Sequence, residues 1–151
     1  VDYTSLRDLL KSGQWKEADQ ETADRMCEVM GLQTEGWLRV EDIQNFPCTD
    51  LRTIDQLWSK YSQGKFGFTV QNQIWKEFGS PENGENWEKF SDRVGWRKDN
   101  YRVPYEDTCF DSSAFPGHLP RLKSQLWWDY CLVPARLECS ALFFRVQTCS
   151  F

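Results

Sequence analysis

The sequence has a single histidine, His118, and its six cysteines form no Cys-x-x-Cys pair. A metal site built from several histidines is therefore excluded, and the cysteine spacings match none of the usual zinc templates. A nucleophilic triad built around any other histidine is excluded as well. His118 stands in 117-GHLP-120. It is a general base, an axial metal ligand or, as we expect, a side chain that binds backbone groups and holds a turn.

The signatures of nucleotide-binding and hydrolytic sites are also missing. The chain contains no G-x-x-x-x-G-K-[ST], no G-x-S-x-G and no G-x-G-x-x-G. Acidic residues are frequent, but in the region of the second predicted helix we expect them to form a solvated face. These residues are Glu17, Asp19, Glu21 and Asp24. We therefore assign no catalytic residue and no tightly bound metal, and we expect a protein that is not an enzyme.

Basic residues are fewer than acidic ones. Eighteen Lys and Arg against 23 Asp and Glu give a net charge of -5 and a pI of about 4.9. This balance provides no global basic field that would attract nucleic acid. No segment approaches the roughly 18 consecutive apolar residues of a membrane span. Residues 1–10 contain two Asp and no apolar core, so we do not expect a signal peptide there.

The cysteines lie at positions 27, 48, 109, 131, 139 and 149. An even number permits a disulfide framework. Cys27, however, lies on an apolar helical stripe, where a small buried thiol is typical. Two interpretations remain open: reduced, mostly buried thiols, which we favour, and disulfide bridges.

Aromatic residues are abundant, with eight Trp, five Tyr and ten Phe, and they recur with other apolar residues at helical spacing. The pattern predicts helices over 4–11, from Trp15 to about Val29, and over 49–61 with Thr49 as N-cap. Two further stripes predict helices ending at Gly79 and Gly95; they are Val70, Ile74, Phe78 and Trp87, Phe90, Val94. No segment alternates as a long strand would. The chain is predicted to be one all-α domain spanning residues 1–151.

Two segments stand out from this pattern as candidate ligand-binding surfaces. Residues 96–120 have three prolines and several aromatic rings but no helical period, which is typical of a functional loop. We expect the loop to be ordered or to become ordered on a ligand. The other segment, 37-WLRVEDIQNFP-47, places Trp37, Val40 and Ile43 at helical spacing. Residues 121–145 carry four basic side chains against two acidic ones, a bias that suits ligand carboxylates.

The run 46-FPCTDLRTIDQLW-58, followed by 62-SQGKFGFTVQ-71, 94-VGW-96 and 117-GHLP-120, resembles the genomes-uncoupled-four family. Its members are tetrapyrrole-binding accessory proteins of magnesium chelatase in oxygenic phototrophs. The resemblance is clear over residues 1–120, including 15-WKEADQETADRM-26, and the sequence diverges over 121–151. Several separate matches in register make the resemblance specific.

The resemblance implies a compact helical domain with a cupped apolar site for protoporphyrin IX or Mg-protoporphyrin IX. It implies a non-enzymatic activator of magnesium chelatase in chlorophyll biosynthesis, acting on the large porphyrin-binding subunit, with a link to plastid signalling. The implied location is the chloroplast stroma, with or without peripheral membrane association, rather than a cyanobacterial cytoplasm. The alternative is a module that contacts the chelatase but has weak or lost porphyrin binding.

The resemblance also implies which residues form the site. One finger over the macrocycle would carry Trp37, Val40 and Ile43, and the opposing finger Val103, Tyr105 and Phe110. Phe68, hinged with Phe66 on Gly67, would contribute to the floor. Arg136 is the expected partner of the ligand propionates if 135–145 resumes the family pattern after an insertion at 127–134; otherwise Lys123 or Arg121 serves. Residues 141–144 and 149–151 are expected to form an exposed apolar end that packs on a partner.

Overall fold

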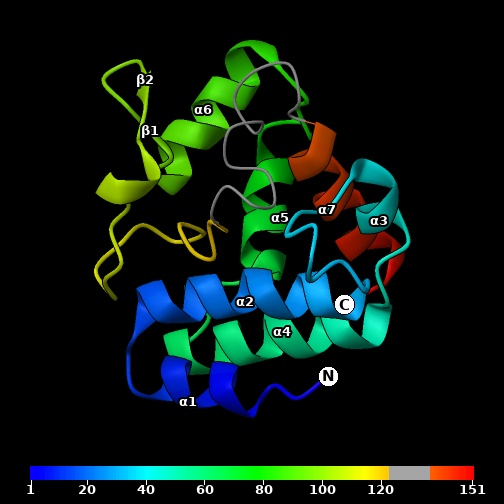
Figure 1. Cartoon of the computed structure of the whole chain (residues 1–151). Coiled ribbons are helices and arrows are strands. Elements are labelled where there is room, and N and C mark those ends of the chain that lie inside the picture. Colours follow the sequence, from blue (N-terminus) through cyan, green and yellow to red (C-terminus); the bar gives the residue numbers. More distant parts are fainter. Residues whose placement is uncertain (123–136) are drawn as a thin grey trace.

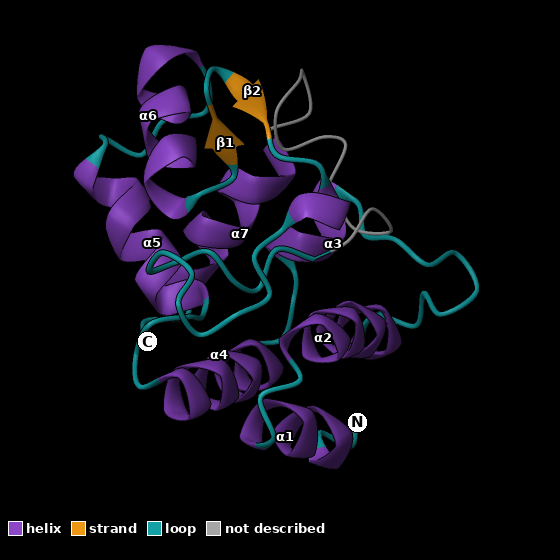
Figure 2. Ribbon diagram, turned by 90° about the vertical axis from the view of Figure 1, so that its left-hand side faces the viewer, coloured by secondary structure: helices purple, strands orange, loops and turns teal. Residues whose placement is uncertain are grey.

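The computed structural model describes residues 1–122 and 137–151, whose helices lie in two layers (Figure 1). The lower layer contains α1 (Thr4–Lys11), α2 (Trp15–Val29) and α4 (Cys48–Ser62). The upper layer contains α3 (Val40–Gln44), α5 (Phe68–Glu77), α6 (Gly84–Val94) and α7 (Leu137–Thr148). Figure 2, turned by 90°, shows the same separation of α1, α2 and α4 from the other helices. The predicted all-α fold is confirmed.

The helix boundaries follow the sequence signals closely, with one error at α4. This helix begins at Cys48, and Pro47, with φ -59°, precedes it as the N-cap residue. Thr49 lies within the first turn, where its carbonyl accepts a 2.9 Å hydrogen bond from the Thr53 hydroxyl, so the predicted N-cap is wrong. Proline fits the start of a helix because its φ is already close to helical and it has no N–H to leave unpaired.

The aromatic residues hold the lower layer together. Trp58 of α4 is fully buried, and its ring lies 6.1 Å from that of Trp15 on α2 and 6.4 Å from that of Phe66. The Trp58 indole donates a 2.9 Å hydrogen bond to the hydroxyl of Thr22, also on α2. Buried indole N–H groups usually have such an acceptor. This cluster explains why a chain of low mean hydropathy carries so many rings.

The Phe66-Gly67-Phe68 sequence forms the passage from the lower layer to the upper one. Both rings are buried, Phe66 at 1% exposure and Phe68 at 0%. Gly67 has φ +122°, a backbone conformation that residues with a side chain rarely adopt. Its N–H donates to the carbonyl of Leu119 at 3.0 Å, which ties this passage to the end of the long loop. The pair therefore belongs to the core.

Helix α7 closes the upper layer by packing on α3 and α5. The Phe143 ring is 1% exposed and lies 5.1 Å from that of Trp75 and 5.8 Å from that of Phe90. The expectation of an exposed apolar end is wrong for Ala141, Leu142, Phe143 and Cys149, which are buried. Phe144 is 46% exposed. The stripe on α7 is buried because α3 and α5 supply the apolar surface that it needs.

The cysteines correct another expectation. Cys48, at the start of α4, forms a disulfide with Cys149, just after α7. The preference for reduced thiols was therefore wrong for this pair, because sequence spacing cannot reveal that two positions 101 residues apart meet. Cys27 is a buried free thiol, as predicted, whereas Cys109 is free and exposed. Cys131 lies outside the described residues.

The long loop contains short regular elements that the sequence analysis missed. Strands β1 (Arg97–Lys98) and β2 (Tyr101–Arg102) pair antiparallel, and the 3₁₀ turn η1 (Tyr105–Asp107) follows. Asp99 and Asn100 connect the strands with φ of +52° and +70°. Two such residues in a left-handed conformation form the tight turn that matches the twist of a hairpin. The Asp-Asn pair was the available signal. Within the described ranges, no helix is long and apolar enough to cross a membrane.

Candidate ligand-binding site

One face of α2 borders a cavity of about 540 Å³. Gln20, Ala23, Asp24 and Cys27 contribute to it at spacings of three and four residues, which places them on the same side of the helix. Gln33 and Gly36, from the segment between α2 and α3, and Arg25 complete the described lining. The volume lies within the roughly 300 to 1,000 Å³ of typical small-molecule sites. Two small side chains, Ala23 and Cys27, leave room above the helix.

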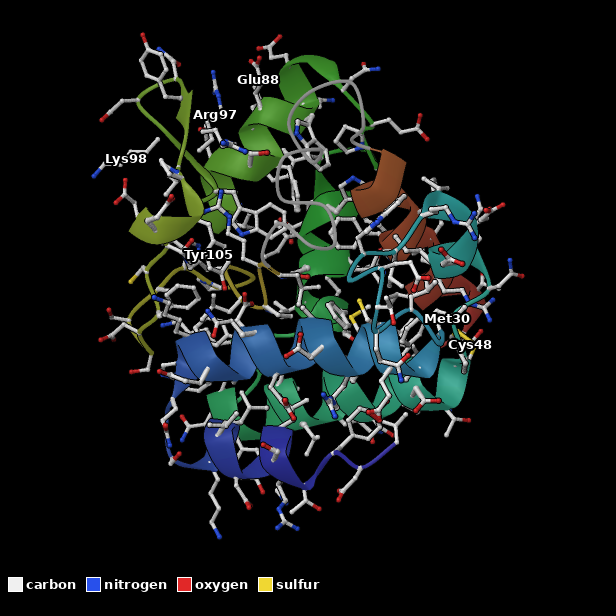
Figure 3. All side chains as sticks on the ribbon, in the orientation of Figure 1. Met30, Cys48, Glu88, Arg97, Lys98 and Tyr105 are labelled. Carbon is white, nitrogen blue, oxygen red and sulfur yellow. A yellow bond between two sulfur atoms is a disulfide. The ribbon has the colours of Figure 1, made fainter. Side chains whose placement is uncertain are left out.

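Two segments without long helices flank α2, one near each end. Figure 3 shows Met30 at the C-terminal end of α2 and Tyr105 above its first half. The segment 31–39 follows Met30 and leads to α3, while the segment 103–122 contains Tyr105. They overlap with the two segments that sequence analysis singled out, 37–47 and 96–120. Both lie above α2, near its two ends (Figure 3).

A buried carboxylate attaches the second of these segments to α2. Asp19 is fully buried and accepts a 2.6 Å hydrogen bond from the Tyr105 hydroxyl. It also accepts hydrogen bonds from the backbone N–H groups of Arg121 at 2.7 Å and Leu122 at 3.0 Å. Burial raises the pKa of the Asp19 carboxyl, and the hydrogen bonds oppose this rise. The expectation of an exposed Asp19 is therefore wrong.

The guanidinium of Arg121 closes this network from the other side. Arg121 is 7% exposed, and it donates to the Thr108 hydroxyl at 2.8 Å and to the carbonyl groups of Val103 and Pro104. Burial lowers the pKa of Arg121 to about 10. Because both its Nη1 and its Nη2 groups donate to these protein groups, Arg121 binds the loop. It is not a free partner for ligand propionates in this conformation.

His118 has the backbone-holding role that was predicted. Its Nδ1 lies 2.7 Å from the carbonyl oxygen of Val94, and its Nε2 accepts a hydrogen bond from the Cys109 N–H at 3.1 Å. Because Nε2 is an acceptor here, the proton of the neutral ring lies on Nδ1 and points to Val94. Burial lowers the pKa of His118 and favours this neutral form. The residue joins the end of α6 to the middle of the loop.

The predicted finger residues lie in the two flanking segments or in α3, with different degrees of exposure. On the first side, Trp37 is 49% exposed, Val40 is half-buried at the start of α3, and Ile43 has no exposed surface. On the second side, Val103 and Phe110 are half-buried and Tyr105 is buried against Phe110, with ring centroids 5.5 Å apart.

Phe68 lies in the core, with no surface available to a ligand in this conformation. The described lining of the α2 cavity includes none of the predicted finger residues. Lys123 and Arg136 lie outside the described residues, so their expected pairing with propionates stays a prediction.

Sequence analysis missed the α2 residues at the bottom of the cavity. It assigned Asp24 to a solvated face and Cys27 to the core. The available signal was the pair of small residues Ala23 and Cys27, one turn apart on a helix whose other residues are mostly charged. In the part of the chain that the structure describes, no group of three or more His, Cys, Asp or Glu residues could hold a metal ion.

Comparison with known proteins agrees with this architecture. The chain is similar to the structure of GUN4 from Chlamydomonas reinhardtii, with a TM-score of 0.74 and 29% identity, over 94% of this chain and 87% of that one. It is also similar to the ligand-free structure of Arabidopsis thaliana GUN4, with a TM-score of 0.74 and 25% identity, over 93% and 90% of the two chains.

Sequence comparison adds relatives from a red alga and a cyanobacterium. The chain is 38% identical over 123 residues to the ycf53 protein of Pyropia yezoensis and 36% identical over 125 residues to a Ycf53-like protein of Synechocystis. These matches cover 80% and 81% of this chain, which spans about half the length of those relatives (50% and 52%). The chloroplastic tetrapyrrole-binding protein of Arabidopsis thaliana is 28% identical over 133 residues, 78% of this chain and 47% of that protein. The sequence model of the GUN4-like family matches residues 1–134, and the chain therefore belongs to the GUN4-like family.

Proposed function

We propose that this protein binds protoporphyrin IX or Mg-protoporphyrin IX over the face of α2 that carries Gln20, Ala23, Asp24 and Cys27, between the segments 31–39 and 103–122. The observation that carries the proposal is the cavity of about 540 Å³ on that face, in a chain of the GUN4-like family. The homologue from Arabidopsis thaliana that is named a tetrapyrrole-binding protein supports the choice of ligand.

The chemistry of the two segments suits a large flat ligand. Trp37 and Val40 offer partly exposed apolar surface on one side, and Val103 and Phe110 offer it on the other. Apolar walls with a few polar groups are typical of sites for such ligands. A porphyrin has on the order of 40 heavy atoms, so roughly -0.3 kcal/mol per atom limits the binding free energy to about -12 kcal/mol. Arg136 remains the proposed partner of the propionates, with Lys123 as the alternative.

We further propose that the bound form stimulates magnesium chelatase through its large porphyrin-binding subunit and that the protein is not itself an enzyme. This activity would serve chlorophyll biosynthesis, with a role in plastid signalling. The proposed location is the chloroplast stroma, with or without peripheral membrane association, and the chloroplastic homologue supports the compartment. A cyanobacterial cytoplasm is the alternative, since a homologue from Synechocystis exists.

The test is a titration of the purified chain with protoporphyrin IX, followed by quenching of tryptophan fluorescence and by the shift of the Soret band. Saturable quenching at one equivalent is the expected result, because Trp37 belongs to the proposed site and the buried Trp rings lie in the same small domain. The Trp37→Phe variant separates quenching by proximity from binding: the Soret shift stays while part of the quenching is lost. Absence of both signals in the wild-type chain would contradict the proposal and favour a chelatase-binding module without a porphyrin ligand.

A further inference from the structure

Three polar groups of the segment 103–122 converge on Asp19. The Tyr105 hydroxyl donates to Oδ2 at 2.6 Å, and the Arg121 N–H donates to Oδ1 at 2.7 Å. The Leu122 N–H lies 3.1 Å from Oδ1 and 3.0 Å from Oδ2. Asp19 has no exposed surface, so water does not compete for these hydrogen bonds. One side chain of α2 thus binds both the beginning and the end of the segment.

The network is closed on itself. Tyr105 starts η1 directly after Val103 and Pro104, whose carbonyls accept hydrogen bonds from the Arg121 guanidinium. The backbone of Arg121 returns to Asp19. Each contact therefore fixes the position of the next, and a chain of such bonds is stronger than its separate members.

Leu122, at the end of the segment, has a backbone conformation that requires support from its surroundings. Its φ is +62°, in the left-handed region that residues with a side chain seldom occupy. Such a conformation persists only when surrounding contacts impose it. The hydrogen bond from the Leu122 N–H to Asp19 is one such contact.

Asp19 also lies next to cavity-lining residues of α2. Gln20 follows it directly in the sequence, Ala23 lies one helical turn after Asp19, and both line the cavity. A change in the Asp19 contacts would therefore act on the position of the segment 103–122 relative to the floor that these residues form.

We infer that Asp19 is a positioning residue for ligand binding: it sets the place of the segment 103–122 above α2 and so the width of the tetrapyrrole site. This inference rests on the proposed function for the identity of the ligand. Asp19 does not touch the ligand; it acts through Tyr105, Arg121 and Leu122.

Two substitutions of Asp19, by alanine and by asparagine, distinguish a positioning role from an effect of its negative charge. In Asp19→Ala the three donors lose their acceptor. In Asp19→Asn the amide oxygen still accepts from both backbone N–H groups, and the amide N–H₂ donates to the phenol oxygen of Tyr105, whose hydroxyl can act as an acceptor. Asparagine therefore keeps the geometry and removes the negative charge. Glu17→Ala, which removes an exposed carboxylate from the same helix, is the matched control.

The experiment measures protoporphyrin IX affinity for the wild-type chain and these variants, together with hydrogen exchange of residues 103–122 without ligand. We expect Asp19→Ala to bind about tenfold more weakly and to exchange faster in this segment, while Asp19→Asn and Glu17→Ala stay within about twofold of wild type. A folded Asp19→Ala protein with wild-type affinity would overturn the inference. An Asp19→Asn protein as weak as Asp19→Ala would overturn it too.

If Asp19→Ala fails to fold, Tyr105→Phe decides, because it removes a single hydroxyl and keeps the ring. We expect about threefold weaker binding and faster exchange near η1; no change in either overturns the inference. If the wild-type chain does not bind protoporphyrin IX at all, the proposed function fails and the role in ligand binding fails with it. Hydrogen exchange then still reports whether Asp19 positions the segment.

Discussion

Gly67 lies so close to Asp55 that a Cβ atom on Gly67 would be 2.8 Å from the Asp55 Oδ1. The same carboxylate accepts hydrogen bonds from the Thr69 N–H at 2.8 Å and from its hydroxyl at 2.6 Å. Asp55 of α4 therefore binds the first turn of α5, where the helix has unpaired N–H groups and favours negative charge. The glycine is required because this contact leaves no space for a side chain.

The first prediction concerns this contact. Gly67→Ala should lower the free energy of unfolding by about 2 kcal/mol or more, since it combines a disfavoured φ with a clash against a carboxylate that cannot move without losing its bonds. Urea unfolding followed by circular dichroism measures the change. Gly64→Ala is the matched control: Gly64 has φ +80°, but a methyl group added there would meet no atom within 4 Å. Equal losses for both would show that the Asp55 contact has no cost of its own.

The second prediction concerns the disulfide between Cys48 and Cys149. The bridge joins positions 101 residues apart, so its loss increases the freedom of the unfolded chain. The double variant Cys48→Ser/Cys149→Ser should lose roughly 2 to 5 kcal/mol of unfolding free energy. Urea unfolding with and without a reductant provides the measurement: the reductant should destabilise the wild-type chain more than the double variant. Cys109→Ser, which alters an exposed free thiol, should behave as wild type.

The third prediction concerns pH. The folded state lowers the pKa of His118 because its ring is buried, while the unfolded chain has the ordinary pKa of about 6.5. As pH falls below this value, the unfolded chain takes up a proton that the folded chain does not, so stability decreases. His118→Gln should be less stable at pH 7.5 but should lose less on going to pH 5.5. Urea midpoints at the two pH values test this, and parallel losses in both proteins would contradict it.

The fourth prediction concerns the floor of the proposed site. Ala23 is 5% exposed and lines the cavity, so Ala23→Leu adds carbon atoms to the space proposed for the ligand. We expect protoporphyrin IX to bind about fivefold more weakly or worse, with little change in helical circular dichroism. Glu17→Leu adds the same side chain to an exposed position of α2 and should leave affinity unchanged. Undiminished affinity in Ala23→Leu would place the ligand elsewhere.

Local signals were sufficient to predict several features of this fold. The stripe of Trp87, Phe90 and Val94 and the stop at Gly95 define α6, which ends at Val94 with Gly95 at φ +82°. His118 was expected to bind backbone groups and does so. The burial of charged residues could not be predicted in this way. Asp19 has the same kind of neighbours in sequence as the exposed Glu17, and nothing local distinguishes a buried carboxylate from a solvated one.

The candidate site was predictable in outline only. The segments around Trp37 and Tyr105 could be predicted because aromatic residues in irregular segments indicate a packing or binding role. The face of α2 between them could not be predicted, since small residues such as Ala23 and Cys27 are common in ordinary helices. Ile43 and Phe68 were expected to meet ligand, but both are completely buried in the hydrophobic core.

The sequence by itself determined the helical class, most helix boundaries and the family, because helix periodicity, caps and short motifs act over a few residues. Only the tertiary structure decided that Cys48 meets Cys149, that Asp19 holds Tyr105 and Arg121, and that α7 is buried. These are contacts between positions 86 to 102 residues apart or between separate helices. Their formation depends on how the layers pack, and packing is a property of the whole chain.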